Sequence, residues 1–149
     1  MTVMAVASLG GHWIQLLRIT SGLNQDWDII YMSTHPECAK TVTGHRFCLI
    51  KDFSRWNPLR LFPAFFNALV YIRKYTPDVL LTTGAAPGLM ALVAARLSGV
   101  KTIWVDSIAN PCSLSLSGKI ASKISTATYT QWENLAVGNV KYAGNVLGD

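Results

Sequence analysis

Four residues that can bind a phosphate or move a proton follow the first apolar run of the chain: Ser8, Gly10, Gly11 and His12. Residues 3–7 before them form the continuous apolar run of a buried parallel strand, and residues 14–23 after them repeat apolar side chains at helical spacing. Glycines in such a strand-to-helix turn let an anion approach the backbone N–H groups of the first helical turn. The turn therefore predicts a phosphate or diphosphate site. The alternative is that the glycines only make a tight turn and that His12 lies on the surface.

A second glycine-containing turn, Gly84-Ala85-Ala86, follows the apolar run 79–83 and precedes a helix of small residues at 89–97. A further strand, 101–106, ends at Asp106 and is followed by Ser107. Strands that alternate with helices at this spacing predict an α/β fold, a Rossmann-like parallel sheet with helices on both faces. In the expected strand order 3-2-1-4-5-6, the first and fourth strands are neighbours whose connections leave in opposite directions. The two glycine turns are therefore expected to enclose one crevice.

Shorter patterns supply the rest of the sheet and its helices. Strands are expected at 28–33, 47–50, 127–131 and 140–142, a weak helix at 37–42 and a short helix at 118–124. Asn57-Pro58 is expected to open a long helix that reaches Ile72, because proline is accepted in a first helical turn. The 149 residues are long enough to bury a core and are expected to form one domain, 1–149.

The composition favours an anionic small molecule or an anionic lipid surface over nucleic acid as the binding partner. Half of the residues are hydrophobic and only 14% are charged, which leaves an apolar surface for a partner protein or a membrane to cover. The net charge of +5 is spread along the chain, without the basic run or aromatic ladder of a nucleic-acid binder.

Cysteine and histidine usage indicates a reduced intracellular protein without a metal. Cys38, Cys48 and Cys112 are odd in number and form no C-x-x-C pair, which predicts free thiols in the cytosol. The three histidines are dispersed, so no metal site is expected. No signal peptide is recognisable, and no apolar run reaches the ~20 residues that span a bilayer.

Two common nucleotide-binding motifs do not fit this chain. The first turn continues as Gly10-Gly11-His12-Trp13 rather than G-x-G-x-x-G, and no acidic residue ends the strand 28–33, so a nicotinamide cofactor is not expected. The segment Ser117-Gly118-Lys119 lacks both the first glycine and the magnesium-binding hydroxyl of a P-loop. The sequence therefore predicts no cofactor.

The helix expected around residues 61–72 suits either a core or a membrane surface. It carries Phe62, Phe65 and Phe66, and Arg60 and Arg73 flank its apolar run. One interpretation buries the helix between the sheet and its neighbours, as doubly wound folds do. The other places the aromatic rings in the headgroup layer of a membrane and the basic residues on lipid phosphates. Different faces of the helix can serve both.

Taken in order, the motifs resemble those of one family from end to end. They are Ser8-Leu9-Gly10-Gly11-His12 followed by Gln15-Leu16-Leu17, then Pro77-Asp78, Gly84-Ala85-Ala86-Pro87, Val105-Asp106-Ser107, the serine-rich segment 113–119, Gln131-Trp132-Glu133 and Tyr142-Ala143-Gly144. The chain resembles the PssD/CpsF-type bacterial glycosyltransferase subunits, which are similar to the membrane-anchoring subunit of the eukaryotic dolichol-linked UDP-N-acetylglucosamine transferase. More distantly it is similar to the N-terminal, acceptor-binding half of MurG, a GT-B enzyme.

This resemblance implies the acceptor-binding subunit of a two-chain UDP-sugar transferase. It would add a sugar to a polyprenyl-diphosphate-linked acceptor in exopolysaccharide or capsule biosynthesis, while a PssE-like subunit holds the UDP-sugar. The chain would be cytoplasmic and peripheral on the inner face of the cell membrane. The alternative is a non-catalytic scaffold that recruits a catalytic glycosyltransferase subunit to the membrane.

Inverting sugar transfer needs a base for the acceptor hydroxyl and positive charge near the diphosphate. His12 is the candidate base, because the positive end of its helix favours the neutral imidazole. Asp106 is the alternative base or orients the acceptor sugar, and the partner chain is another possible source of the base. Simpler roles are that His12 hydrogen-bonds a phosphate and that Asp106 caps the serine-rich loop. The other expected contacts are Ser8, Gly10, Gly11, Gly84, Ala85, Ala86 and Ser107 for the acceptor diphosphate, and Gln131, Trp132 and Glu133 for the partner chain.

Overall fold

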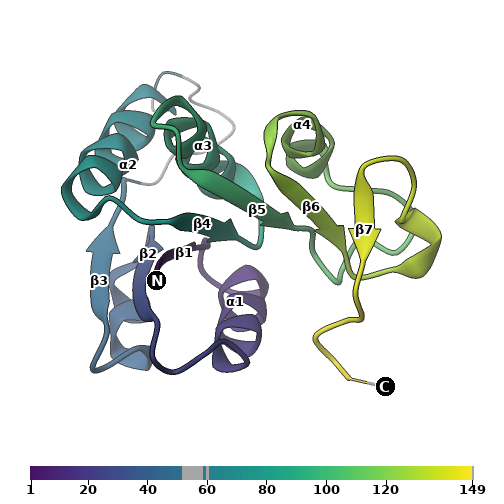
Figure 1. Cartoon of the computed structure of the whole chain (residues 1–149), viewed down its shortest axis with the longest axis horizontal. Coiled ribbons are helices and arrows are strands. Elements are labelled where there is room, and N and C mark those ends of the chain that lie inside the picture. The colour runs from purple at the N-terminus through teal and green to yellow at the C-terminus, as the bar shows by residue number, and fades with distance from the viewer. Residues whose placement is uncertain (52–58, 60, 149) are drawn as a thin grey trace.

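Seven parallel strands form one sheet at the centre of the computed structural model, which describes residues 1–51, 59 and 61–148 (Figure 1). Their order is β3-β2-β1-β4-β5-β6-β7. The inner strands are apolar runs because helices cover both faces of the sheet. The strands are β1 (Thr2–Val6), β2 (Asp28–Ser33), β3 (Arg46–Leu49), β4 (Val79–Thr82), β5 (Lys101–Val105), β6 (Ala127–Thr130) and β7 (Val140–Tyr142).

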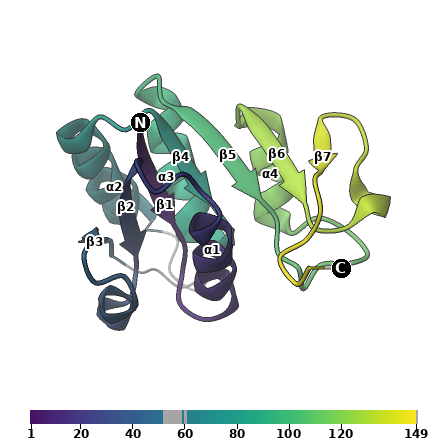
Figure 2. The same cartoon turned by 60° about the horizontal axis from the view of Figure 1, so that its bottom comes forward.

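The helices form two layers, which Figures 1 and 2 show on opposite faces of the sheet. One face carries α1 (Gly11–Ser21) and the 3-10 helix η1 (Pro36–Thr41). The other face carries α2 (Leu61–Tyr75), α3 (Ala85–Leu97) and α4 (Leu116–Ile124). A second 3-10 helix, η3 (Glu133–Leu135), lies between β6 and β7.

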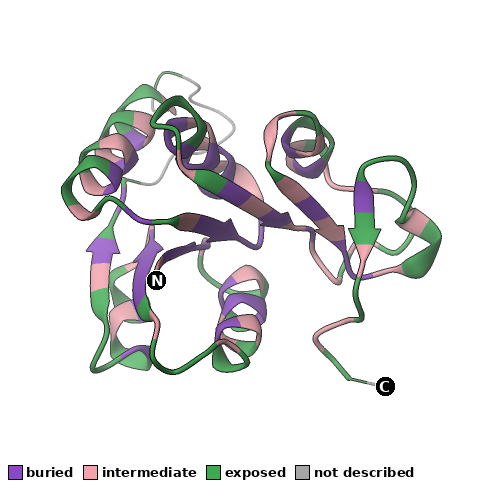
Figure 3. Ribbon diagram, in the orientation of Figure 1, coloured by how far each residue is buried: buried purple, intermediate pink, exposed green. Residues whose placement is uncertain are grey.

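Successive residues of the central strands enter two separate cores. Met4 of β1 packs into the cluster formed with α2, α3 and α4, whereas the next residue, Ala5, packs with Trp13 and Leu16 of α1. This alternation follows from the two-residue period of a strand. Figure 3 shows the result, with buried central strands between helices that are exposed only on their outer sides. The edge of the sheet that carries the glycine turns therefore lies between helices packed on both faces.

The predicted fold class and strand order are confirmed, and β7 extends the order beside β6. α1 ends at Ser21, two residues earlier than expected, and the Gly22 N–H closes it by donating to the Ile19 carbonyl at 3.1 Å. The expected helix start at Asn57-Pro58 lies outside the described residues.

The start of α3 differs more, because the helix begins at Ala85 and not at residue 89. Pro87 is accommodated because it lies in the first turn, where its missing N–H has no helical acceptor. Gly88 is required rather than merely tolerated, since a Cβ there would overlap the Thr82 hydroxyl. Residues that look like helix breakers in the sequence thus form the first turn of a helix.

Candidate functional site

The two glycine turns lie side by side, because β1 and β4 are hydrogen-bonded neighbours and both turns follow their carboxyl ends (Figure 2). Gly10 precedes α1 and Gly84 precedes α3, with φ angles of +88° and +129° that favour glycine. The N–H groups at the starts of both helices therefore lie at one edge of the sheet, where partial positive charge attracts an anion. The sequence prediction that the two turns meet is confirmed.

His12 bridges the two turns from the first turn of α1. Its Nδ1 lies 3.0 Å from the Thr83 carbonyl oxygen, and the Thr83 hydroxyl donates to the His12 carbonyl at 2.6 Å. A carbonyl oxygen only accepts hydrogen bonds, so Nδ1 must carry the proton. In the neutral imidazole, Nε2 then keeps its lone pair and can accept a proton from a substrate. The half-buried ring is thus set in the tautomer that a base requires.

Gly84 provides the space for the imidazole ring. A Cβ at this position would lie 2.8 Å from Cε1 and 2.9 Å from Nδ1 of His12, closer than van der Waals contact allows. Gly10 and Gly11 differ, since a Cβ at either would have no atom of the described residues within 4 Å. The turn before α3 is filled by the chain's own histidine, and the turn before α1 is open to a ligand.

Ala85 adds backbone strain to the site. Its φ of +64° lies in the left-handed region, which costs a residue other than glycine on the order of 1 kcal/mol. Ala85 and Ala86 are half-buried at the start of α3, and Ser8 is half-buried before α1. These residues lie at the edge of the sheet where the sequence placed a diphosphate, and their contact with a ligand stays a prediction.

Asp106 is buried directly after β5, and its carboxylate is engaged within the chain. Oδ1 accepts from the Trp104 indole N–H at 3.0 Å and from the Ser115 hydroxyl at 2.6 Å, and Oδ2 accepts from the Ser115 N–H at 2.9 Å. Ser115 in turn caps α4 by accepting from the Gly118 N–H at 2.9 Å. These contacts argue against Asp106 as the base and favour the simpler role, in which it fixes the end of the loop that leads to α4.

Gln15 is a functional candidate that the sequence patterns did not reveal. It is buried on α1, and its carboxamide contacts the loop after β5 at Asp106 and Ile108. Ser107, the predicted phosphate contact, is half-buried in the same loop and its hydroxyl accepts from the Ala109 N–H at 3.2 Å. In the sequence, Gln15 belongs to the motif Gln15-Leu16-Leu17 and follows His12 by three residues, which puts both side chains on one side of a helix, but neither signal gave it a role.

The three residues expected to bind a partner separate in the structure. Gln131 is buried and its Oε1 accepts from the Val146 N–H at 3.0 Å, and the Trp132 indole N–H donates to the Ile108 carbonyl at 2.9 Å. Only Glu133 is exposed, so the prediction is wrong for Gln131, which holds the C-terminal segment instead. Beside this segment lies an open hollow of about 540 Å³, lined by α1, the ends of β5 and β6, and residues 143–148.

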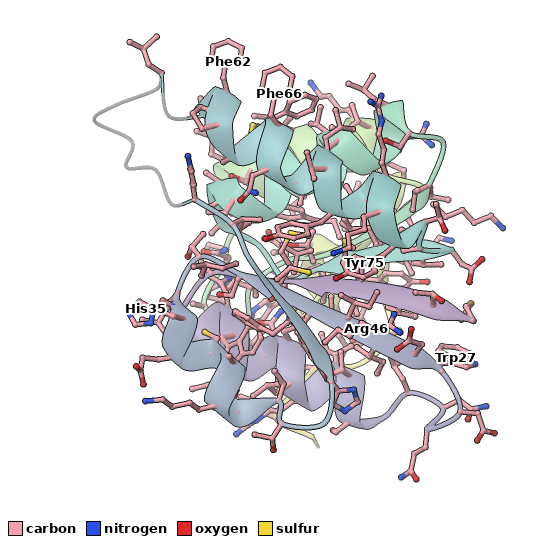
Figure 4. All side chains as sticks on the ribbon, turned by 90° about the vertical axis from the view of Figure 1, so that its left-hand side faces the viewer. Trp27, His35, Arg46, Phe62, Phe66 and Tyr75 are labelled. Carbon is pink, nitrogen blue, oxygen red and sulfur yellow. The ribbon has the colours of Figure 1, made fainter. Side chains whose placement is uncertain are left out.

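The helix α2 divides into an inner and an outer face at intervals of four residues. Buried on the inner face are Ala64, Ala68 and Ile72. Exposed on the outer face are Phe62 (63%), Phe66 (56%) and Val70 (62%). Figure 4 shows Phe62 and Phe66 pointing away from the rest of the fold. The inner face of α2 therefore fits the interpretation as a core helix, and the outer face remains available for the interpretation as a membrane surface.

The residues predicted to meet a membrane do not all lie on that outer face. Phe65 is half-buried and packs against the core cluster, and its contact with a membrane stays a prediction. Arg73 is exposed in the last turn of α2, and Arg60 lies outside the described residues. Within residues 1–51, 59 and 61–148, no helix has the length and apolar character needed to cross a bilayer.

Among the described residues, no three His, Cys, Asp or Glu side chains gather as the ligands of a metal ion would. Cys38 and Cys48 are buried and Cys112 is exposed, and all three are free thiols. Burial raises the pKa of the Cys48 thiol above its ordinary value, although the Lys74 ammonium and a hydrogen bond with Tyr75 act in the opposite direction.

The family model described as "Oligosaccharide biosynthesis protein Alg14 like" matches residues 51–146. The chain belongs to the Alg14-like family. The matched part of this Alg14-like chain includes Gly84, Asp106 and the loop after β5, whereas His12 and the first glycine turn precede it.

The Alg14-like chain is also similar to longer proteins. The UDP-N-acetylglucosamine–N-acetylmuramyl-(pentapeptide) pyrophosphoryl-undecaprenol N-acetylglucosamine transferase of Shewanella loihica is 26% identical over an alignment 153 positions long, which covers 93% of this chain and 41% of that protein. MurG of Acinetobacter baumannii has a TM-score of 0.80 at 18% identity, covering 95% of this chain and 45% of that one. UDP-N-acetylglucosamine 2-epimerase of Rickettsia bellii has a TM-score of 0.76 at 13% identity, covering 99% and 45%. The chain spans less than half the length of these relatives, and the structural likeness establishes its fold.

Proposed function

We propose that this Alg14-like chain is the acceptor-binding, membrane-associated subunit of a two-chain UDP-sugar glycosyltransferase. The proposed reaction resembles that of a UDP-N-acetylglucosamine transferase and adds a sugar to a polyprenyl-diphosphate-linked acceptor for exopolysaccharide or capsule. Membership of an oligosaccharide biosynthesis family supports this proposal. So does the Shewanella loihica relative, whose name describes N-acetylglucosamine transfer to a pyrophosphoryl-undecaprenol substrate.

The observation that carries the proposal is the state of His12 beside the two glycine turns. Its Nδ1 is bound to the Thr83 carbonyl, so Nε2 is the atom that accepts a proton. In the proposed reaction, Nε2 removes the proton of the acceptor hydroxyl while that oxygen bonds to the anomeric carbon of the donor sugar. The bond from that carbon to the diphosphate breaks, and UDP leaves with the electron pair.

The acceptor diphosphate is proposed to bind across the two helix starts. Gly10 and Gly11 leave the first turn open to an anion, and the backbone at Gly84, Ala85 and Ala86 supplies the second helix start. Partial positive charge at both helix ends stabilises a diphosphate without a metal. The hydroxyls of Ser8 and Ser107 flank the same edge of the sheet.

The donor UDP-sugar is proposed to bind mainly to a second, PssE-like chain. The present chain spans 41% of the Shewanella loihica relative, and 95% of it corresponds to the fold of 45% of MurG. The hollow beside residues 143–148 and the exposed Glu133 offer a surface at the carboxyl edge of the sheet for that chain.

The membrane surface is proposed to be the outer side of α2, α3 and α4, facing the inner leaflet of the cell membrane. These helices contain no acidic residue, and their five basic residues are Arg73, Lys74, Arg96, Lys119 and Lys123. Each basic residue near an anionic bilayer contributes about 1 kcal/mol. The exposed apolar side chains on the same helices include Phe62, Phe66 and Leu116.

Vesicle sedimentation tests this surface. The double change Phe62→Ser and Phe66→Ser should reduce binding to anionic vesicles at low salt about tenfold or more, because both rings leave the bilayer interface. Val137→Ser is the matched control, since Val137 is 73% exposed and lies outside these helices. Equal binding by the parent chain, the double variant and Val137→Ser would contradict the proposed surface.

The transfer reaction is tested with the purified chain, its partner chain, a UDP-sugar and a polyprenyl-diphosphate-sugar. His12→Ala should lower turnover by about 10²- to 10⁴-fold while the complex still assembles, because a general base is lost. The exposed His45 provides the control variant, His45→Ala, which should keep its activity. Unchanged turnover in His12→Ala would favour the scaffold alternative, and rapid transfer without the partner chain would contradict the two-chain proposal.

A further inference from the structure

Gln15 is a buried polar residue to which the proposed reaction gives no part. It follows His12 by three residues, so the two side chains project from the same side of α1. His12 contacts Thr83 at the end of β4, whereas Gln15 contacts the loop after β5. Because β4 and β5 are neighbours, two side chains fasten one helix to the ends of two adjacent strands.

The Gln15 carboxamide uses both of its ends. Nε2 donates to the Asp106 carbonyl at 3.0 Å, with the Val105 carbonyl at 3.5 Å, and Oε1 accepts from the Ile108 N–H at 3.1 Å. Carbonyl oxygens only accept and a backbone N–H only donates, so a single orientation of the amide satisfies all of these groups. A buried donor left without its acceptor costs about 1–3 kcal/mol. These hydrogen bonds, which we call the Gln15 clamp, therefore need both the donor and the acceptor of a glutamine side chain.

The loop that Gln15 contacts, residues 107–115, also accepts hydrogen bonds from other side chains. The Trp132 indole N–H donates to the Ile108 carbonyl at 2.9 Å, and the Asn134 amide donates to the Pro111 carbonyl at 3.1 Å. The Asp106 carboxylate holds Ser115 at the far end. Gln15 is the clamp that comes from the helix carrying His12.

We propose that Gln15 is a positioning residue. It holds the loop 107–115 at a fixed place relative to His12, so that the loop and the imidazole can contact the same bound acceptor. The inference rests on the proposed function, because it takes His12 as the base. A displacement of about 1 Å at a reacting group can cost roughly 100-fold in rate. Loss of the clamp therefore lowers turnover without removing a group that touches the substrate.

The clamp itself is tested on the isolated chain, without any assay of transfer. In Gln15→Leu the Ile108 amide loses its acceptor, so its hydrogen exchange should accelerate about tenfold more than that of amides that exchange only by global unfolding. The His12 ring ¹⁵N shifts should keep the Nδ1–H pattern that the Thr83 carbonyl imposes. Thr20→Val is the matched control. Thr20 is buried on the same helix and accepts a hydrogen bond from the Tyr31 hydroxyl at 2.9 Å, but it does not contact the loop. It should leave the Ile108 exchange unchanged.

Gln15→Glu supplies a variant whose defect depends on pH. Once ionised, the new carboxylate has no proton to donate to the Asp106 carbonyl, and the ordinary pKa of glutamate is about 4.3. Burial and this carbonyl raise the pKa of the introduced glutamate in the folded chain. Its melting temperature should therefore match that of the parent chain near pH 4 and fall below it as the pH rises toward the folded pKa. A deficit that does not vary with pH would contradict the hydrogen-bond assignment.

With the partner chain, Gln15→Leu should lower kcat about 10- to 100-fold and leave KM for the UDP-sugar unchanged. Ile108 exchange like that of Thr20→Val would overturn the inference, whatever the activity. If Ile108 exchange accelerates as expected but no complex transfers sugar, the clamp is supported and the proposed function fails. The two failures are therefore distinguishable.

Discussion

The two glycine turns have similar backbones, but a side chain of the protein fills only one of them. Gly10 and Gly84 each follow a buried strand, adopt a positive φ and precede a helix without a side-chain cap. A Cβ added to Gly10 would have no atom of the described residues within 4 Å, whereas at Gly84 the His12 ring occupies that space. One turn leaves room for a ligand from solution, and the other makes room for a side chain of the same protein.

This difference shows that a glycine in a strand-to-helix turn has two separable uses. Both residues relieve backbone strain, because the conformations at Gly10 and Gly84 are essentially restricted to glycine. Only Gly84 also relieves a steric conflict with a side chain that is proposed to react. Substitutions at the two turns can therefore separate the cost of strain from the cost of displacing His12.

The largest expected effect belongs to Gly84→Ala. Backbone strain should lower the stability of Gly84→Ala and of Gly10→Ala by about 1–3 kcal/mol each. Gly84→Ala also pushes the imidazole away from Thr83, so it should lose more stability and about 100-fold in turnover. Urea unfolding and transfer rates of the two variants measure this difference. Equal losses at both positions would show that His12 does not depend on Gly84.

The second effect is the coupling between Gly84 and His12. When His12→Ala removes the ring, Gly84→Ala should cost less stability, because the methyl group enters vacated space. A double-mutant cycle should give a coupling energy of about 0.5–3 kcal/mol, the range for residues in contact. The same cycle with Gly10→Ala should give a value near zero, and a coupling of similar size there would contradict the distinction between the turns.

Thr83→Val should have a smaller effect. The change removes the hydroxyl that donates to the His12 carbonyl but keeps the Thr83 carbonyl that faces Nδ1. The expected loss of stability is about 0.5–1.5 kcal/mol, with a smaller loss of turnover than in Gly84→Ala. Thermal unfolding and kcat check this order, and a turnover loss as large as that of Gly84→Ala would contradict it.

The smallest effect on stability is expected for Gly11→Ala. Gly11 is the first residue of α1, does not have a positive φ, and a Cβ there would have no atom of the described residues within 4 Å. Stability should be unchanged or rise by up to about 1 kcal/mol, as for glycine-to-alanine changes in a compatible backbone. The methyl group should weaken pyrophosphate binding several-fold by calorimetry. Unchanged affinity would contradict an anion site at this turn.

The meeting of the two turns is predictable from the sequence, because it depends on strand periodicity and on topology. Apolar runs specify the strands, and right-handed connections bring β1 next to β4. The position of His12 between the two turns follows from the same argument. No atomic detail is needed for these conclusions.

The contacts of individual side chains are not predictable in this way. The Phe65 and Phe66 side chains are adjacent in sequence, yet only the rotation of α2 on the sheet sends one toward the core and the other outward. The carboxylate of Asp106 meets Ser115 only after the intervening loop has folded. The role of Gln15 likewise depends on loop carbonyls more than 90 residues away in the sequence.

The loop 107–115 is held at its peptide groups by Gln15, Trp132 and Asn134, all of which lie outside it. Its outline is therefore independent of most of its own side chains. Substitutions at positions such as Asn110 and Ser113 should therefore leave the path of the loop backbone unchanged. If the loop contacts the acceptor as proposed, these are the positions at which the chemistry of that contact can be changed without disturbing the fold.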